Sequence, residues 1–155
     1  MSSVRETAKR QYARALNSAA EQAANLKTPR EGWIATMRKA LGMSAPELAK
    51  RLGVTKPAIY QAERKERDGG VTLKHMERLA EALGGKFVYA IVPDGQIEDV
   101  LREQARTKAE AVVRRASSHM ALEKQSLTSA QMRDEIDRLA EELLRERPSD
   151  FWEAS

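Results

Sequence analysis

Apolar residues recur at spacings of three and four along most of the chain, which is the period of an amphipathic α-helix. Short polar segments containing Gly, Pro, Ser or Thr interrupt this pattern and mark the expected helix ends. The pattern therefore predicts a mainly α-helical protein. The predicted helices cover residues 4–26, 28–41, 44–52, 55–64, 72–83, 97–120 and 128–147.

Several of these helices carry start and stop signals. Thr28 followed by Pro29 predicts the start of the second helix, because threonine is a good N-cap and proline fits the first helical turn. Ser44 and Glu47 have the spacing of a capping box, in which side chains and backbone satisfy each other's hydrogen bonds. Gly53 is expected to end that helix, so that a short turn separates it from the next one.

Only one segment has the composition of a β-strand. It runs K-F-V-Y-A-I-V from residue 86 and ends before a Pro-Asp-Gly turn. Both of its alternating faces are apolar, and a lone strand leaves its backbone hydrogen-bonding groups unpaired. We therefore expect a short strand over residues 86–93 that pairs antiparallel with its own copy in a homodimer, or that joins the sheet of a partner. The side chains expected at this dimer contact are Phe87, Tyr89 and Ile91.

Three other segments have less distinctive sequence patterns. Residues 64–70, R-K-E-R-D-G-G, are polar and end in two glycines, so they are expected to form a loop. The helix predicted over residues 4–26 has a thin, alanine-rich apolar stripe, which indicates packing on another helix of the same or a second chain. Two aromatic residues near the C-terminus, Phe151 and Trp152, either anchor a partner or fold back onto the chain's own helices.

Residues 45–64 carry the pattern A-P-E-L-A-K-R-L-G-V-T-K-P-A-I-Y-Q-A-E-R, which closely resembles the Cro/XRE-type helix-turn-helix. The small side chain of Ala49 allows two helices to cross closely, and Gly53 accepts a positive φ at the turn. Val54 and Ile59 are expected to fill the space beneath. The resemblance implies a lambda-repressor-like DNA-binding domain with flanking long helices. The matching positions are Leu48, Ala49, Gly53, Val54, Ile59 and Glu63.

The same resemblance places the helix of residues 55–64 in the DNA major groove, with its N-terminal end nearest the bases. Lys56 is a candidate for guanine O6 and N7, and Gln61 for adenine N6 and N7. Tyr60 is expected to contact a thymine methyl group or the DNA backbone. Pro57 departs from the polar residue often found there in the family, so contact at that base is apolar or absent. The candidates for phosphate contact are Ser44, Arg51, Thr55, Arg64 and Lys65.

The charges are unevenly distributed. The 155 residues include 27 Lys and Arg against 23 Asp and Glu, a net charge of +4. Residues 1–92 carry +8 and residues 93–155 carry −4. This asymmetry suggests that the first part meets a polyanion such as double-stranded DNA, while the second faces solvent or another partner. The expected divisions are an N-terminal helix, a helix-turn-helix domain, a strand and an acidic helical region, at residues 1–27, 28–85, 86–93 and 94–155.

The sequence offers no catalytic constellation. The chain has no cysteine, which excludes disulfides and thiolate chemistry and points to a reducing compartment. The two histidines, His75 and His119, lack metal-ligand spacing, and the paired glycines lie at predicted helix ends rather than in a phosphate loop. We therefore expect no catalytic residue, no metal and no cofactor. No export signal or membrane span is visible in the sequence, so we expect a cytoplasmic protein that does not enter a membrane.

A wider set of segments resembles the mobile mystery protein A family, from about residue 29 to near the end of the chain. These segments are P-R-E-G-W-I-A-T-M-R-K-A-L-G-M-S, V-T-L-K-H-M-E-R-L-A-E-A-L-G, F-V-Y-A-I-V-P and M-A-L-E-K-Q. Members of that family are encoded beside a Fic-domain protein, so the resemblance implies an antitoxin-like regulator of a Fic-type toxin.

The S/T-x-x-x-E-G/N motif by which known Fic inhibitors obstruct the active site is missing from the chain. The nearest serines are followed four residues later by other side chains, so a contact with a Fic protein would differ from that motif. These pairs are Ser18 with Gln22, Ser126 with Ala130, and Ser129 with Arg133.

Two functions are consistent with these patterns and are mutually compatible. The first is a dimeric, sequence-specific repressor that binds a pseudo-palindromic operator. The second is a protein-interaction module whose acidic C-terminal helices neutralise a toxin enzyme, with DNA binding secondary. A nonspecific DNA-coating protein is disfavoured, because the basic residues are few and are interspersed with acidic ones.

Overall fold

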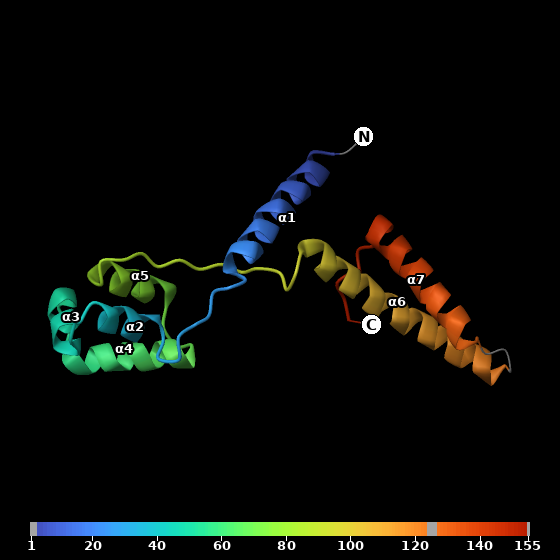
Figure 1. Ribbon diagram of the computed structural model, residues 1–155. Helices are drawn as coiled ribbons and strands as arrows, with labels where there is room; N and C mark the ends of the chain where they lie inside the picture. The colour runs from blue at the N-terminus through green and yellow to red at the C-terminus, as the bar shows by residue number, and fades with distance from the viewer. Residues whose placement is uncertain (1–2, 124–126, 155) are drawn as a thin grey trace. The chain divides into compact units, whose positions relative to one another are not determined.

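The computed structural model describes residues 3–123 and 127–154, and within these ranges the chain forms seven helices. The prediction of a mainly helical protein is therefore confirmed. None of the helices in the described ranges is long and apolar enough to cross a membrane. The helices are α1 (Val4–Ala23), α2 (Trp33–Ala40), α3 (Ala45–Leu52), α4 (Lys56–Asp68), α5 (Leu73–Ala82), α6 (Ile97–Leu122) and α7 (Ser129–Glu146), drawn in Figure 1.

The chain divides into two compact units, one of residues 25–90 and the other of residues 1–24 with 91–155. The helix-turn-helix region predicted over residues 28–85 lies within the first unit. Part of the M-A-L-E-K-Q segment and one serine compared with the Fic-inhibitor motif lie outside the described residues. These positions are Lys124, Gln125 and Ser126.

The unit of residues 25–90 has one hydrophobic core, to which α2, α3, α4 and α5 all contribute (Figure 1). Leu48 of α3, Ile59 of α4 and Leu79 of α5 are fully buried at its centre, and Ile34 of α2 packs with them. Each such side chain contributes about 1.5–3 kcal/mol when it leaves water. Because α4 turns Ile59 inward, the opposite face of α4 is left in solvent.

In the other unit, α6 and α7 lie side by side as a helical hairpin (Figure 1). Ala105 and Ala109 of α6 are fully buried, and the small side chain of Ala109 packs with residues of α7. Ile136 of α7 fills the space between the helices. An ion pair at the surface, between Arg106 Nη1 and Asp137 Oδ1 at 2.9 Å, also joins α6 to α7.

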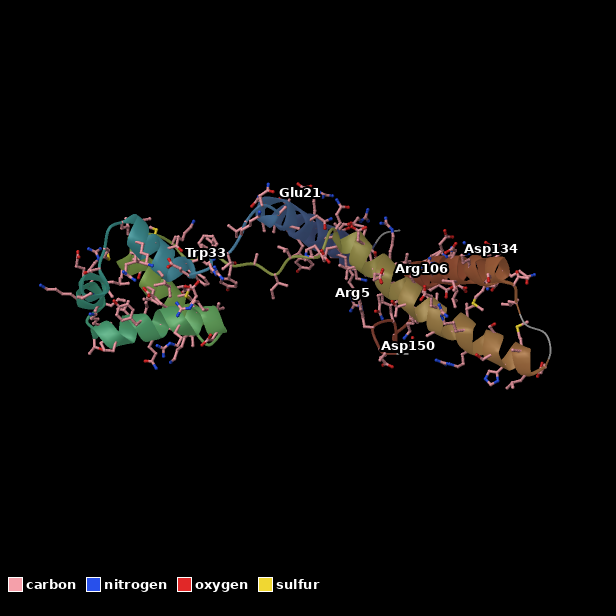
Figure 2. The ribbon with its side chains drawn as sticks, turned by 60° about the horizontal axis from the view of Figure 1, so that its bottom comes forward. Arg5, Glu21, Trp33, Arg106, Asp134 and Asp150 are labelled. Carbon is pink, nitrogen blue, oxygen red and sulfur yellow. The ribbon has the colours of Figure 1, made fainter. Side chains whose placement is uncertain are left out.

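The C-terminal segment folds back onto α6, which was one of the two alternatives left open by the sequence. The Phe151 side chain is buried, and its carbonyl oxygen accepts a hydrogen bond of 2.6 Å from Gln104 Nε2. The nearly buried Lys108 ammonium donates to the carbonyl oxygens of Asp150 and Glu153, and Figure 2 labels Asp150 in this returning segment. Trp152, by contrast, remains 61% exposed.

α1 joins its unit chiefly through one side chain. Asn17 accepts a 2.8 Å hydrogen bond from the Ile97 backbone N–H and donates a 3.0 Å bond to Glu98, so it caps the start of α6. None of the residues of α1 is buried, and Tyr12 is 70% exposed. The alanine-rich stripe predicted to pack on another helix is therefore largely uncovered in the single chain.

The predicted start of the second helix is wrong. Pro29 begins a turn that the Gly32 N–H closes on the Pro29 carbonyl at 3.0 Å, Thr28 precedes this turn, and α2 begins only after Gly32. The N-terminus of α2 is capped by the Glu66 carboxylate of α4, whose two oxygens accept from the backbone N–H groups of Trp33 at 2.6 Å and Ile34 at 2.9 Å. A cap supplied by a distant residue leaves no local sequence signal.

The predicted loop over residues 64–70 is also wrong, because α4 continues to Asp68. Its polar composition obscured the helix, yet Glu66 of this segment and the preceding Glu63 both have partners inside the protein. Glu63 pairs with Arg38, and Glu66 caps α2. The paired glycines then end the helix as expected, with Gly69 at φ 83°.

The predicted strand over residues 86–93 does not form: the ranges that the structure describes contain no β-strand, and this segment connects α5 to α6 without regular structure. The physical reason is that a lone strand leaves its backbone hydrogen-bonding groups without partners, as noted for the sequence. A strand requires a neighbouring backbone, and no other extended segment lies beside this one to supply it. Phe87 instead packs on the core of its own unit, while Tyr89 and Ile91 are exposed.

The cap of α2 makes Gly32 a sensitive position. Its φ of 89° with ψ of 166° is a region that only glycine adopts readily, and an added Cβ would lie 2.9 Å from Glu66 Oε1. We expect Gly32→Ala to destabilise this unit by about 1–3 kcal/mol from backbone strain, and to displace the Glu66 cap as well. Urea unfolding followed by circular dichroism measures the loss.

Gly42→Ala is the matched control for Gly32→Ala. Gly42 follows α2 with a φ of 65°, but no atom lies within 4 Å of its added Cβ. The stability loss of Gly42→Ala therefore measures the backbone strain of a non-glycine residue at positive φ, without a steric clash. A loss for Gly32→Ala no larger than the loss for Gly42→Ala would show that the contact with Glu66 contributes nothing.

Candidate nucleic-acid interface

α3 and α4 are joined by a short turn with a defined backbone path. Gly53 ends α3 in the left-handed region, with φ 70°, and the Val54 N–H donates to the Ala49 carbonyl at 2.9 Å. Thr55 then has an extended backbone and caps α4, because its hydroxyl oxygen accepts from the Ala58 N–H at 3.3 Å. The predicted helix, turn and helix are therefore confirmed.

Burial fixes the rotation of α4 about its axis. Ile59, Ala62 and Glu63 are buried and point into the unit. Val54 was expected to be buried beneath the turn, but it is 39% exposed, so Ile59 fills that space largely alone. The residues on the opposite side of α4 are exposed. They are the six predicted DNA contacts on this helix: Lys56, Pro57, Tyr60, Gln61, Arg64 and Lys65.

Two of these candidates are in contact with each other. Lys56 Nζ lies over the ring of Tyr60, 5.8 Å from its centroid. They are four residues apart and so occupy one edge of the exposed face. The cation–π contact holds a positive charge and an aromatic ring together at the N-terminal end of α4.

Two of the three acidic residues of α4 have partners inside the protein. Glu63 Oε1 lies 2.8 Å from Arg38 Nε, with both side chains buried, and Arg38 Nη1 also donates to the Met43 carbonyl at 3.1 Å. Glu66 is held at the start of α2. The exposed face therefore keeps its cations, while most of the negative charge of the same helix is directed away from it.

The N-terminus of α4 offers fewer backbone donors than a typical anion site. Pro57 has no N–H, and the Ala58 N–H already donates to Thr55. This leaves the Lys56 N–H as the donor of the first turn. A phosphate at this end would depend on the Lys56 side chain as much as on the helix itself.

The structure weighs against Ser44 as a second phosphate contact. Its hydroxyl accepts from the Glu47 N–H at 3.2 Å and donates to Glu47 Oε1 at 2.8 Å, which confirms the predicted capping box. The hydrogen bonds from the Ser44 hydroxyl and backbone hold the pKa of the Glu47 carboxyl below its ordinary value. An ionised carboxylate thus occupies the N-terminus of α3 and repels a second anion.

One nitrogen of the Arg51 guanidinium already has a hydrogen-bond partner within the fold. Its Nε donates to the Ala82 carbonyl at 2.7 Å, at the C-terminal end of α5. A cation there also interacts favourably with the helix dipole. Only the terminal guanidinium nitrogens of Arg51 are left for a phosphate.

Sequence reasoning missed two residues that shape this surface. Arg38 and Glu66 were not singled out, although Arg38 holds Glu63 away from the exposed face and Glu66 is itself held at the start of α2. Glu63 was recognised as a match to the family without a role. A basic residue at a helical position otherwise occupied by core side chains, as Arg38 is in α2, was the available signal of a buried partner.

The fold and the exposed basic face of α4 define a helix-turn-helix domain. Residues 34–89 match a family model described as helix-turn-helix, which covers α3, α4 and α5 and all of α2 except its first residue. No curated protein and no solved structure matches the chain. The Cro/XRE-type resemblance is thus supported over this region, whereas the narrower resemblance to mobile mystery protein A finds no support in these comparisons.

Proposed function

We propose that the protein is a sequence-specific, DNA-binding transcriptional repressor and not an enzyme. The observation that supports this proposal most directly is the exposed face of α4, where Lys56, Tyr60 and Gln61 lie opposite the buried Ile59. This unit, residues 25–90, contains 13 basic and 7 acidic residues. The family match over residues 34–89 supports the proposal, because helix-turn-helix domains place one helix in the major groove.

We assign the exposed residues of α4 to two kinds of DNA contact, those to base edges and those to phosphates. Lys56 and Gln61 have the donors and acceptors that distinguish guanine and adenine in the major groove, and Tyr60 adds an apolar ring beside them. Arg64 and Lys65 lie further along α4 and supply charge for the phosphates. Two copies of the protein would bind the two half-sites of a pseudo-palindrome, about 34 Å apart.

This division of roles predicts different responses to salt. Lys65→Ala removes a proposed phosphate contact, so we expect weaker binding to all sequences and a salt dependence, log K against log salt, that is shallower by about one unit. Gln61→Ala removes a proposed base contact, so we expect the slope to persist while the preference for the target falls by about 1–3 kcal/mol. Fluorescence anisotropy with DNA from upstream of the protein's own coding region, at several salt concentrations, measures both.

The controls for this experiment are a scrambled DNA of the same length and the wild-type protein. Binding of the wild type that does not respond to salt would contradict phosphate contact altogether. Equal losses on the target and the scrambled DNA for Gln61→Ala would remove that residue from base recognition.

We propose as a second function that the protein is the antitoxin and autoregulator of a Fic-type toxin, with the α6–α7 hairpin as the part that binds the enzyme. The supporting observations are the resemblance to mobile mystery protein A and the net charge of −4 on residues 93–155. Asp134 and Glu141 are both exposed and lie seven residues apart, on one face of α7. The exposed Arg138 and Arg145 share this face, so a partner would place basic groups against the two carboxylates and acidic groups against the two arginines.

Co-expression with the product of the neighbouring gene tests this second function. Wild-type protein should co-purify with that product and relieve its toxicity, whereas the charge reversals Asp134→Lys and Glu141→Lys should abolish both effects. Lys56→Ala, which lies outside the hairpin, serves as the control and should retain them. Full protection by the charge-reversed protein would contradict a role for this face of α7.

A further inference from the structure

The segment of residues 86–92 has an unpaired backbone. None of its N–H or C=O groups hydrogen-bonds to another residue within the described ranges. The rings of Phe87 and Tyr89 stack with their centroids 5.7 Å apart, which places these alternate residues on the same side of the backbone, as in an extended chain. The backbone is therefore extended at Phe87–Tyr89, and no neighbouring backbone in the described ranges pairs with the segment.

The same segment exposes apolar side chains beside an apolar groove. Val88 and Tyr89 are 69% and 67% exposed, and Ile91 is 89% exposed. The groove lies on the surface of the helix-turn-helix unit, between α2, α5 and the start of the segment, and Trp33 and Met37 line it. Exposed apolar side chains are unfavourable in water, and an unpaired extended backbone is a template for pairing, so together they favour a partner that supplies both apolar contact and backbone hydrogen bonds.

We propose that a second copy of the protein docks here, with the two segments of residues 86–92 paired as antiparallel strands. Backbone pairing requires an extended partner with the same spacing of groups, and the segment is complementary to itself when reversed. Its residues from 87 to 92 carry no charge, so no like charges meet within the pairing. Apolar side chains of each copy then cover the groove of the other.

The charges at the two ends of the segment select the antiparallel arrangement. A register centred on Tyr89 places that residue opposite itself and Phe87 opposite Ile91 of the second copy. Lys86 then lies diagonal to Asp94 of the second copy, on the same face and within reach of a long side chain. A parallel arrangement would instead place the two Lys86 ammonium groups side by side.

This interface goes beyond the proposed function, and supports it, because two recognition helices on a pseudo-palindrome require two copies. The oligomeric state is therefore measured on protein without DNA, and DNA binding is measured separately. A monomer that still binds DNA would overturn the interface alone, and a dimer that fails to bind DNA would overturn the DNA function alone.

Disulfide trapping tests the register. The chain has no cysteine, so each variant carries a single thiol. Residues directly opposite each other in an antiparallel pair have Cα atoms about 4.5–5.5 Å apart, which suits a disulfide. Tyr89→Cys should therefore form a covalent dimer rapidly with diamide as oxidant, as seen on non-reducing gels. Val92→Cys should not, because the two copies of residue 92 would lie about 20 Å apart.

Charge insertion tests the interface without cysteine. Ile91→Lys should raise the dimer dissociation constant by at least about tenfold, measured by analytical ultracentrifugation, because it removes an apolar side chain from the contact. Leu122→Lys is the matched control, since Leu122 is 84% exposed near the end of α6 and its replacement should leave the dimer intact. An unchanged dimer for Ile91→Lys, a monomer for Leu122→Lys, or equal cross-linking of Tyr89→Cys and Val92→Cys would overturn the proposal.

Discussion

Glu63→Ala should destabilise the helix-turn-helix unit by about 3–5 kcal/mol, because it leaves the Arg38 guanidinium buried without its counter-charge. The two groups lie 2.8 Å apart, with side-chain exposures of 9% for Arg38 and 6% for Glu63. The measurement is urea unfolding followed by the fluorescence of Trp33, in a Trp152→Phe background that leaves Trp33 as the only tryptophan.

Two further variants test whether burial of the Arg38–Glu63 pair causes this loss of stability. Glu31→Ala breaks an ion pair with Lys39 of similar length, 2.7 Å, but at an exposed site of the same unit. It should change the unfolding free energy far less, because solvent screens both charges. Replacing Arg38 and Glu63 together by methionine should recover most of the loss, since no charge is then left alone in the core. A loss for Glu63→Ala as small as that for Glu31→Ala would contradict the account of this pair.

The double variant Lys56→Ala/Tyr60→Ala should lose specific DNA binding by a factor of about 30 or more. Each residue is assigned a contact to a base or to the backbone beside it, and one good base contact is worth about 1–3 kcal/mol. Both side chains are exposed, so the fold should be unaffected. Anisotropy titration of the upstream DNA measures the loss, and circular dichroism checks that the helices remain.

α1 offers a matched control for this double variant. Lys9 and Tyr12 are an exposed lysine and tyrosine on one helix, outside the helix-turn-helix unit. Lys9→Ala/Tyr12→Ala removes the same charge and the same ring, so any general effect of charge on DNA binding should appear in both variants. Equal losses for the two pairs would mean that α4 has no special role.

The parts of the fold that were predictable have local causes. The capping box of Ser44 and Glu47, the left-handed glycine at the turn and the threonine cap of α4 all act within a few residues, so the sequence displays them. The exposed face of α4 followed from the helical period, because fixing Ile59 inward fixes Tyr60 and Gln61 outward.

The parts that were missed depend on residues far apart in the sequence. Glu66 caps α2 from more than thirty positions away, and so the apparent Thr28-Pro29 start misled the prediction. The polar run of residues 64–70 looked like a loop, because the hydrogen bonds that Glu66 accepts from the start of α2 leave no local pattern in the sequence. The strand predicted over residues 86–93 does not form, because a strand depends on a neighbouring backbone, and the described parts of the chain place none beside this segment.

Methylation interference on the upstream DNA tests the central claim, that α4 recognises DNA through the major groove, most directly. Methylating guanine N7 blocks the major-groove edge, whereas methylating adenine N3 blocks the minor groove. We predict that binding fails when guanine N7 is methylated within two short half-sites about one helical turn apart, and that adenine N3 methylation there has little effect. Interference confined to adenine N3, or no interference at any base, would contradict the claim.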